Sequence, residues 1–166
     1  MLSLLKILAM IQRIQTVFLA LVAALGVVFS FVPVLGFNVT NGGGFIMNAY
    51  KSINVETGEV IAKNMGVGVL QGVVILLCIV IILMFKNRAL QMKLAKFNIL
   101  LIAVQIAAIV MYSDTAKTAI GVNPEIITVA YKFGCVIPLV SLILTYLSIR
   151  FIKKDDELVR SADRLR

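Results

Sequence analysis

Four long stretches without a charged side chain constrain this sequence more than any other feature. They cover residues 14–50, 64–85, 97–113 and 133–149. A helix needs about 20 mostly apolar residues to cross the hydrocarbon core of a bilayer. We therefore expect four membrane-spanning helices, at about residues 14–36, 65–85, 97–113 and 127–150.

The composition points to the same class of protein. Of the 166 residues, 61% are hydrophobic and 14% are charged. A soluble domain is typically about 45–50% apolar and roughly 25% charged. Four spans leave no room for a separate soluble domain. The predicted fold is an all-α membrane protein, in which residues 1–166 form one antiparallel bundle of four transmembrane helices.

The basic residues distinguish the two sides of the expected membrane. Twelve of the 16 Lys and Arg residues fall at the two chain ends and between the second and third spans. The other four are Lys51, Lys63, Lys117 and Lys132. Because short cytoplasmic loops collect Lys and Arg, we expect both termini on the cytoplasmic side. Lys132 lies near the outer end of its span, where its side chain can reach the interface.

The longest outside segment is the loop expected at residues 37–64. Its sequence "NGGG" (residues 41–44) favours irregular backbone. The following "SINVETGEVIA" (residues 52–62) has β-branched residues on both sides of Gly58. Glycine supplies the positive φ that tight turns require, so this segment predicts a small β-hairpin. A solvated loop is the alternative.

Few residues in the expected spans suggest chemistry. No Asp or Glu lies in any of the four, whereas proton relays and ion paths usually need such residues. Histidine is absent, which excludes Ser-His and Cys-His catalytic pairs and the usual haem ligands. No phosphate-binding loop is present. We therefore expect no enzyme activity, no catalytic residue, no metal or cofactor site and no nucleic-acid partner.

Uncharged polar and small residues remain inside the spans. Gln105 and Ser141 fall near the centres of the third and fourth spans, and each should find a hydrogen-bond partner on another helix, which could be the other residue. Lining a solute path is the alternative, with a kink at Pro138 as its hinge. The pair Gly68 and Gly72 permits close helix packing.

The chain ends in "DDELVRSADRLR" (residues 155–166), which follows the last span in a cytoplasmic tail expected at residues 151–166. Asp156 and Glu157 lie at favourable helical spacings from Arg160, so the tail should extend the last helix. Its acidic start could meet the basic segment at residues 86–96, and solvated charge is the alternative. The candidate interaction residues are Asp155, Asp156, Glu157, Arg160, Asp163, Arg164 and Arg166.

Both ends of the chain carry a resemblance. "MIQRIQT" (residues 10–16) and the terminal "DDELVRSADRLR" resemble the two ends of a family of uncharacterised bacterial four-helix membrane proteins, domain-of-unknown-function family 4293. The resemblance implies a multi-pass protein of the bacterial inner membrane. It carries over no catalytic or binding residue. Family members begin at the methionine of the first motif, so Met10 is an alternative start to Met1.

Two functions fit these patterns. The first is a structural or accessory membrane protein, which would contact the lipid bilayer and bind a membrane-protein partner or a second copy of itself. The uncharged spans and the patterned, charged ends favour it. The alternative is a small channel or transporter with a path near Gln105, Ser141 and Pro138.

Overall fold

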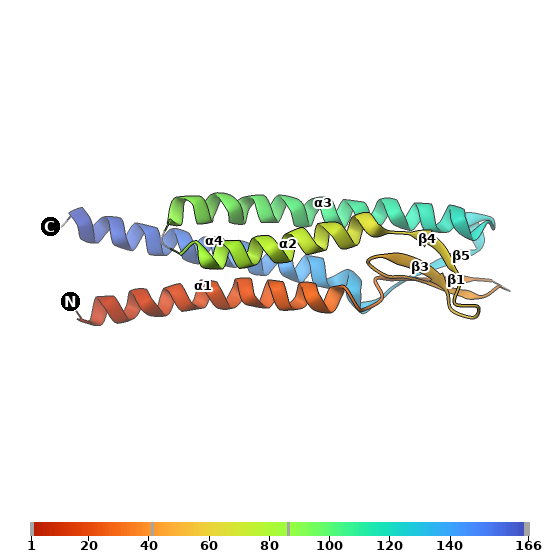
Figure 1. Ribbon diagram of the computed structural model, residues 1–166, viewed down its shortest axis with the longest axis horizontal. Coiled ribbons are helices and arrows are strands. Elements are labelled where there is room, and N and C mark those ends of the chain that lie inside the picture. Colours follow the sequence, from red (N-terminus) through yellow and green to blue (C-terminus); the bar gives the residue numbers. More distant parts are fainter. Residues whose placement is uncertain (1, 41, 86, 165–166) are drawn as a thin grey trace.

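The computed structural model describes residues 2–40, 42–85 and 87–164 and shows a long helical bundle with a sheet at one end (Figure 1). The helices are α1 (Leu2–Phe29), α2 (Met65–Leu83), α3 (Arg88–Ile120) and α4 (Phe133–Arg164). The strands are β1 (Leu35–Val39), β2 (Gly44–Met47), β3 (Lys51–Asn54), β4 (Val60–Lys63) and β5 (Ile127–Tyr131). A short 3₁₀ turn, Pro124–Ile126, precedes β5.

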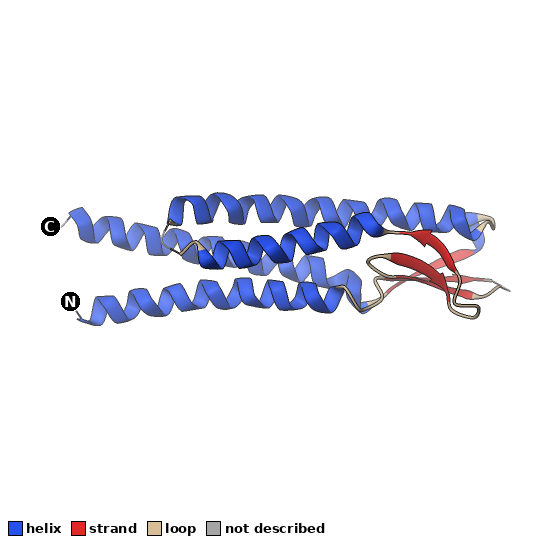
Figure 2. Ribbon diagram, viewed as in Figure 1, coloured by secondary structure: helices blue, strands red, loops and turns tan. Residues whose placement is uncertain are grey.

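The sheet shows that the all-α prediction was wrong. Its five strands run in the order β4-β3-β2-β1-β5, and all neighbours are antiparallel (Figure 2). The hairpin expected around Gly58 is present as β3–β4, but it forms the edge of this larger sheet. Strand β5 occupies residues that were expected to begin the fourth span. Only Lys132 lies between its uncharged sequence "ITVAY" and the apolar run of α4, and a lysine near the end of a span is tolerated, so length and charge did not separate strand from helix.

The expectation of four equivalent spanning helices also needs correction. Among the described residues, three segments are long and apolar enough to cross a membrane, namely Met65–Leu83, Arg88–Ile120 and Phe133–Leu158. In α1, whose side chains are described from Ile14 onward, the described apolar segment is Ile14–Phe29. The first span was expected to reach residue 36, but the helix ends before Pro33 and the chain continues as β1. Proline disfavours helical backbone at the residue before it, which explains this early end.

Local sequence also sets the limits of α3. The side chain of Asn87 accepts a hydrogen bond from the backbone N–H of Leu90 at 3.2 Å and caps the first turn. At the other end, Gly121 adopts a φ of 76°, the left-handed conformation that commonly closes a helix and that glycine tolerates best.

The buried residues of the helices recur at a seven-residue spacing. In α3 one set is polar and the other apolar: Gln91, Asn98 and Gln105, then Ala95, Ile102, Ile109 and Ala116. Similar sets occur in α2 and α4: Val67, Val74 and Ile81, then Ser141, Ser148 and Asp155. A sustained repeat of seven keeps one seam of a helix against its neighbours and is typical of left-handed supercoiled bundles.

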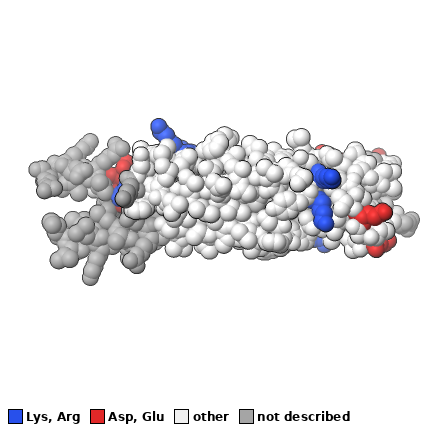
Figure 3. Space-filling model, viewed as in Figure 1, with Lys and Arg blue, Asp and Glu red and all other residues white. Residues whose placement is uncertain are grey.

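The bundle carries apolar side chains on its outside and many polar side chains inside. Exposed residues of α2, α3 and α4 include Val69, Leu76, Ile79, Leu100, Val104, Met111, Leu139 and Ile143. Buried polar residues include Gln15, Gln71, Gln91, Asn98, Gln105, Ser141, Thr145 and Ser148. The face in Figure 3 is correspondingly free of charged side chains along most of the bundle. Such a surface is suited to hydrocarbon rather than water.

We call the exposed apolar surface of the bundle the apolar belt. Charged residues mark both of its ends along α3 and α4. Lys96 and Asp114 are 18 residues apart on α3, and Arg150 of α4 is 18 residues from Lys132, which directly precedes the first residue of α4. At 1.5 Å per residue, each interval covers about 27 Å, close to the thickness of a bilayer hydrocarbon core. Asp114 and Lys132 both lie at the sheet end of the bundle, so this end marks one boundary of the belt.

Candidate functional site

A seam of polar side chains connects α2 and α3 inside the bundle. The Gln105 side-chain amide donates a hydrogen bond to the Gln71 amide oxygen at 2.7 Å, and both residues are 3% exposed or less. One heptad away, the Asn98 amide donates to the Cys78 sulfur at 3.4 Å. Hydrogen bonds between buried polar groups hold helices together where lipid supplies no alternative partner.

The partner of Gln105 is therefore Gln71, and not Ser141 as the sequence allowed. Ser141 is buried in α4, and its backbone carbonyl accepts a hydrogen bond from the Thr145 hydroxyl at 2.7 Å. Pro138 is also buried, near the start of the same helix. Gln105, Ser141 and Pro138 are therefore all buried between helices, and the choice between a packing role and a solute path stays a prediction.

The two glycines expected to pack helices together occupy different surroundings. Gly68 is buried, and a methyl group there would overlap the ring of Tyr50 from the turn before β3. Gly72 is exposed, with nothing within 4 Å of the position that a methyl group would take. Close contacts between helices occur at Gly26 of α1, where a methyl group would overlap the Gln71 amide of α2, and at Gly66 of α2, where it would overlap the Tyr112 side chain of α3. A lone glycine within α1 gave no sequence signal for the contact at Gly26.

An ion pair joins α3 to α4 at the end of the bundle away from the sheet. The Arg88 guanidinium lies 2.7 Å from the Asp155 carboxylate. Asp155 is only 1% exposed and Arg88 is 22% exposed. The second carboxylate oxygen, Oδ1, has no hydrogen-bond partner among the described residues. The contact expected between the acidic start of the tail and the basic segment at residues 86–96 is therefore present at Asp155. The burial of this carboxylate in the bundle was not expected from the sequence.

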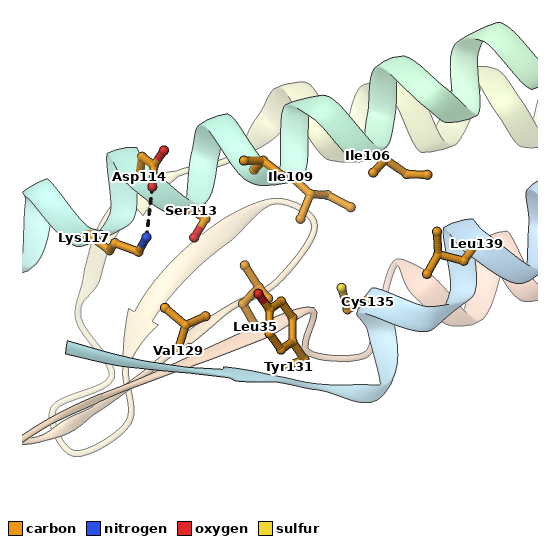
Figure 4. Close-up of a pocket in the computed structure, with 11 residues that line it drawn as sticks. Leu35, Ile106, Ile109, Ser113, Asp114, Lys117, Val129, Tyr131, Cys135 and Leu139 are labelled. Atoms are coloured by element: carbon orange, nitrogen blue, oxygen red, sulfur yellow. Dashed lines mark hydrogen bonds and ion pairs between the residues drawn. The ribbon is translucent and has the colours of Figure 1, made fainter. Parts of the chain in front are cut away.

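A cleft of about 210 Å³ lies where the bundle meets the sheet, between α3, the start of α4 and strands β1 and β5 (Figure 4). Its lining is mostly apolar: Leu35, Ile106, Ile109, Val110, Val129 and Leu139. Four polar residues and one thiol complete it: Ser113, Asp114, Lys117, Tyr131 and Cys135. The Lys117 ammonium lies 3.0 Å from the Asp114 carboxylate at one end of the cleft. None of these residues was selected as a site from the sequence, because β1, β5 and α4 bring five of the eleven lining residues to α3 from other parts of the chain.

Comparison with known families identifies the chain. The family described as a domain of unknown function, DUF4293, matches residues 11–165. The chain belongs to this family. No curated protein matches the sequence. The DUF4293 match covers nearly all of the bundle and the whole sheet, so the sheet is part of the family domain and not an addition to it.

The remaining candidate residues of this DUF4293 chain lie at the end of α4. Asp156 and Glu157 follow Asp155 in the helix, and Glu157 lies 3.8 Å from Lys153 in an exposed pair. The backbone at Arg160, Asp163 and Arg164 is helical, but their side chains lie outside the described part of the structure. Arg166 lies outside the described residues. The contacts of these side chains stay a prediction.

Both end helices of the DUF4293 fold extend past the connection between α2 and α3 (Figure 1). Asp155 contacts Arg88, the first residue of α3, so the residues that follow Asp155 in α4 continue beyond the start of α3. We call residues 156–166 the terminal segment. The start of α1 lies at the same end of the molecule. The bundle therefore presents two helical projections at the end opposite the sheet.

Proposed function

We propose that this protein is a non-enzymatic accessory protein of a bacterial cytoplasmic membrane, in which the terminal segment binds a partner membrane protein. The bundle lies in the bilayer, both chain ends face the cytoplasm and the sheet faces the outside. The observation that carries this proposal is the continuation of α4 as a helix past the start of α3.

The distribution of charge supports this orientation. The sheet end carries Glu56, Glu59 and Glu125 on its surface, whereas most Lys and Arg residues belong to the opposite end. Lys and Arg are retained on the cytoplasmic side of membrane proteins. The basic residues of α4 near this end, including Arg150, Lys153 and Lys154, also suit the anionic lipid of that leaflet.

The burial of the hydrogen-bonded pair Gln71 and Gln105 favours an accessory role over transport. Gln71 and Gln105 satisfy one another, and the terminal segment extends away from the seam rather than over it. A helical segment rich in charged residues that continues beyond the bundle is a common form of partner-binding segment.

The test is site-specific cross-linking in the native membrane. A photo-reactive residue at Ser161, which is exposed in the terminal segment, should give a cross-link to one protein of defined mass. The same residue at Val55, exposed on the sheet, is the matched control and should not give that product.

A truncation sharpens the test. Deleting residues 156–166 keeps Asp155 and its ion pair, so the bundle should remain folded while the partner no longer co-purifies with a carboxyl-terminal tag. A variant with a shuffled terminal segment keeps the composition and charge of that segment. Loss of the partner in this variant would show that binding requires the order of the residues and not only their charge. Cross-links to lipid alone would contradict the proposal. A partner that still co-purifies with the truncated protein would also contradict it. A product of twice the chain mass would identify a second copy as the partner.

A further inference from the structure

The cleft between α3, α4 and β5 crosses the boundary of the apolar belt. Ile106 and Leu139 line its deep end, which lies within the belt, and Asp114 and Lys117 line its other end, beside the sheet (Figure 4). From Ile106 to Lys117 the cleft follows 11 residues of α3, about 16 Å at 1.5 Å per residue. Its polarity therefore changes along the axis of the bundle, from apolar inside the belt to charged at its edge.

The cleft opens onto the surface that faces lipid. Val110 and Leu139 both line it, and both are exposed on the outside of the bundle. An occupant can therefore enter sideways from the bilayer without leaving hydrocarbon. A soluble ligand would have to bring a polar group past these apolar side chains, at a cost in desolvation.

The charged end presents one group of each sign. The Lys117 ammonium and the Asp114 carboxylate are 3.0 Å apart and partly exposed, at 29% and 70%. Exposed pairs of this kind contribute little to stability, so each group can exchange its partner for a ligand. A phosphate would accept hydrogen bonds from Lys117, and a primary ammonium would donate to Asp114. A purely anionic head group would satisfy Lys117 and leave Asp114 facing a like charge.

The size of the cleft fits part of one acyl chain. A cavity of about 150 Å³ lined by apolar side chains is large enough to bind benzene. The cleft is larger, at about 210 Å³, and its opening lets a chain continue into the surrounding lipid. The hydroxyl of Tyr131, the residue before Lys132 at the edge of the apolar belt, points into the cleft in Figure 4.

We propose that the cleft binds one zwitterionic phospholipid of the outer leaflet, with a phosphate and a primary ammonium in its head group. The acyl chain lies against Ile106 and Leu139, the phosphate contacts Lys117 and the ammonium contacts Asp114. The assignment to the outer leaflet rests on the proposed orientation of the bundle, whereas the binding residues lie at the opposite end of the molecule from the terminal segment. Loss of the cross-link at Ser161 would therefore leave the lipid site standing, and loss of the lipid preference would leave partner binding by the terminal segment standing.

The test is lipid titration of the full chain in mild detergent, followed by native mass spectrometry. The probes are phosphatidylethanolamine and phosphatidylglycerol with the same acyl chains. The first bound phosphatidylethanolamine should bind about five-fold more tightly than phosphatidylglycerol, the ratio expected for about one favourable head-group charge contact. Equal affinity for the two lipids would overturn the proposal.

Two variants locate the binding. Leu139→Trp fills the deep end of the cleft from an exposed position and should weaken the first phosphatidylethanolamine site at least about five-fold. Ile143→Trp, one turn further along α4 and outside the cleft, is the matched control and should leave that affinity unchanged. Equal behaviour of the two variants would show that the lipid coats the bundle without occupying the cleft, and would overturn the proposal.

Head-group variants separate the two charges. Asp114→Asn should bring the ratio of the two affinities close to one, because it removes the partner of the phosphatidylethanolamine ammonium and also the like charge that opposes phosphatidylglycerol. Lys117→Gln should weaken both lipids, because both carry the phosphate. A retained preference for phosphatidylethanolamine in Asp114→Asn would contradict the assignment of its carboxylate.

Discussion

The bundle and the sheet differ in whether polar side chains lie in the interior or on the surface. In the bundle, residues such as Gln71, Asn98 and Gln105 are buried and apolar side chains cover the outside. At the sheet, Phe37 and Met47 are buried in a cluster with Phe29, while acidic residues occupy the surface. The red side chains at the sheet end of Figure 3 contrast with the uncharged belt beside them.

This difference is the one expected when the bundle is surrounded by hydrocarbon and the sheet by water. Burying apolar surface away from water lowers the free energy, so the sheet forms an apolar cluster against the ends of the helices. In hydrocarbon, burying apolar side chains between helices gives no such gain in free energy. Helices there associate through close packing and hydrogen bonds. The bundle accordingly places its amides between helices and uses Gly26 for a close approach of α1 to α2.

A charge placed on each surface should give the largest contrast. Ile143→Lys puts an ammonium near the middle of the belt on a residue that is 58% exposed, and should cost about 3 kcal/mol of insertion free energy. Val60→Lys is the control, because Val60 is half exposed on the sheet and a surface change there should cost less than about 0.5 kcal/mol. The measurement is the inserted fraction of each variant in a membrane-insertion assay. Equal costs would show that both regions face the same solvent.

The next largest effect should come from the end of the bundle. Asp155→Ala leaves the Arg88 guanidinium without its carboxylate and should destabilise the protein by about 2–3 kcal/mol. The cost of breaking a fully buried pair is higher, but Arg88 keeps some access to solvent. Unfolding in mixed detergent micelles measures the change. Glu157→Ala removes an exposed carboxylate of the same helix and should change stability by less than about 0.5 kcal/mol.

The smallest effect should come from the polar seam. Gln71→Leu and Gln105→Leu should each cost about 1 kcal/mol, because each leaves one buried amide without its partner. The double variant should cost less than the sum of the two, with a coupling near 0.6 kcal/mol. The same micelle unfolding experiment measures this cycle. Fully additive costs would show that the two amides do not depend on one another.

The sequence by itself determined the family, the long apolar helices and the position of the hairpin at Gly58. These features depend on local properties: runs of apolar residues, turn residues and two terminal motifs. It also indicated that Gln105 would be bonded to another helix. It did not identify Gln71 as the partner, because hydrophobic patterning says which face is buried and not which helix covers it.

The sequence also indicated that the acidic start of the tail could meet the basic segment at residues 86–96. Only the tertiary structure decided the full sheet, the burial and exact partner of Asp155, and the cleft. Strand β5 pairs with β1 across most of the chain, and no local pattern specifies a pairing at that distance. Asp155 sits beside acidic neighbours in a polar tail, yet the antiparallel packing of α3 and α4 brings Arg88 to it and buries it. The cleft exists because β5 and α4 meet α3 at the membrane boundary. Each of these features is created by contacts between distant segments, and such contacts are set by how the elements pack and not by the residues of any one element.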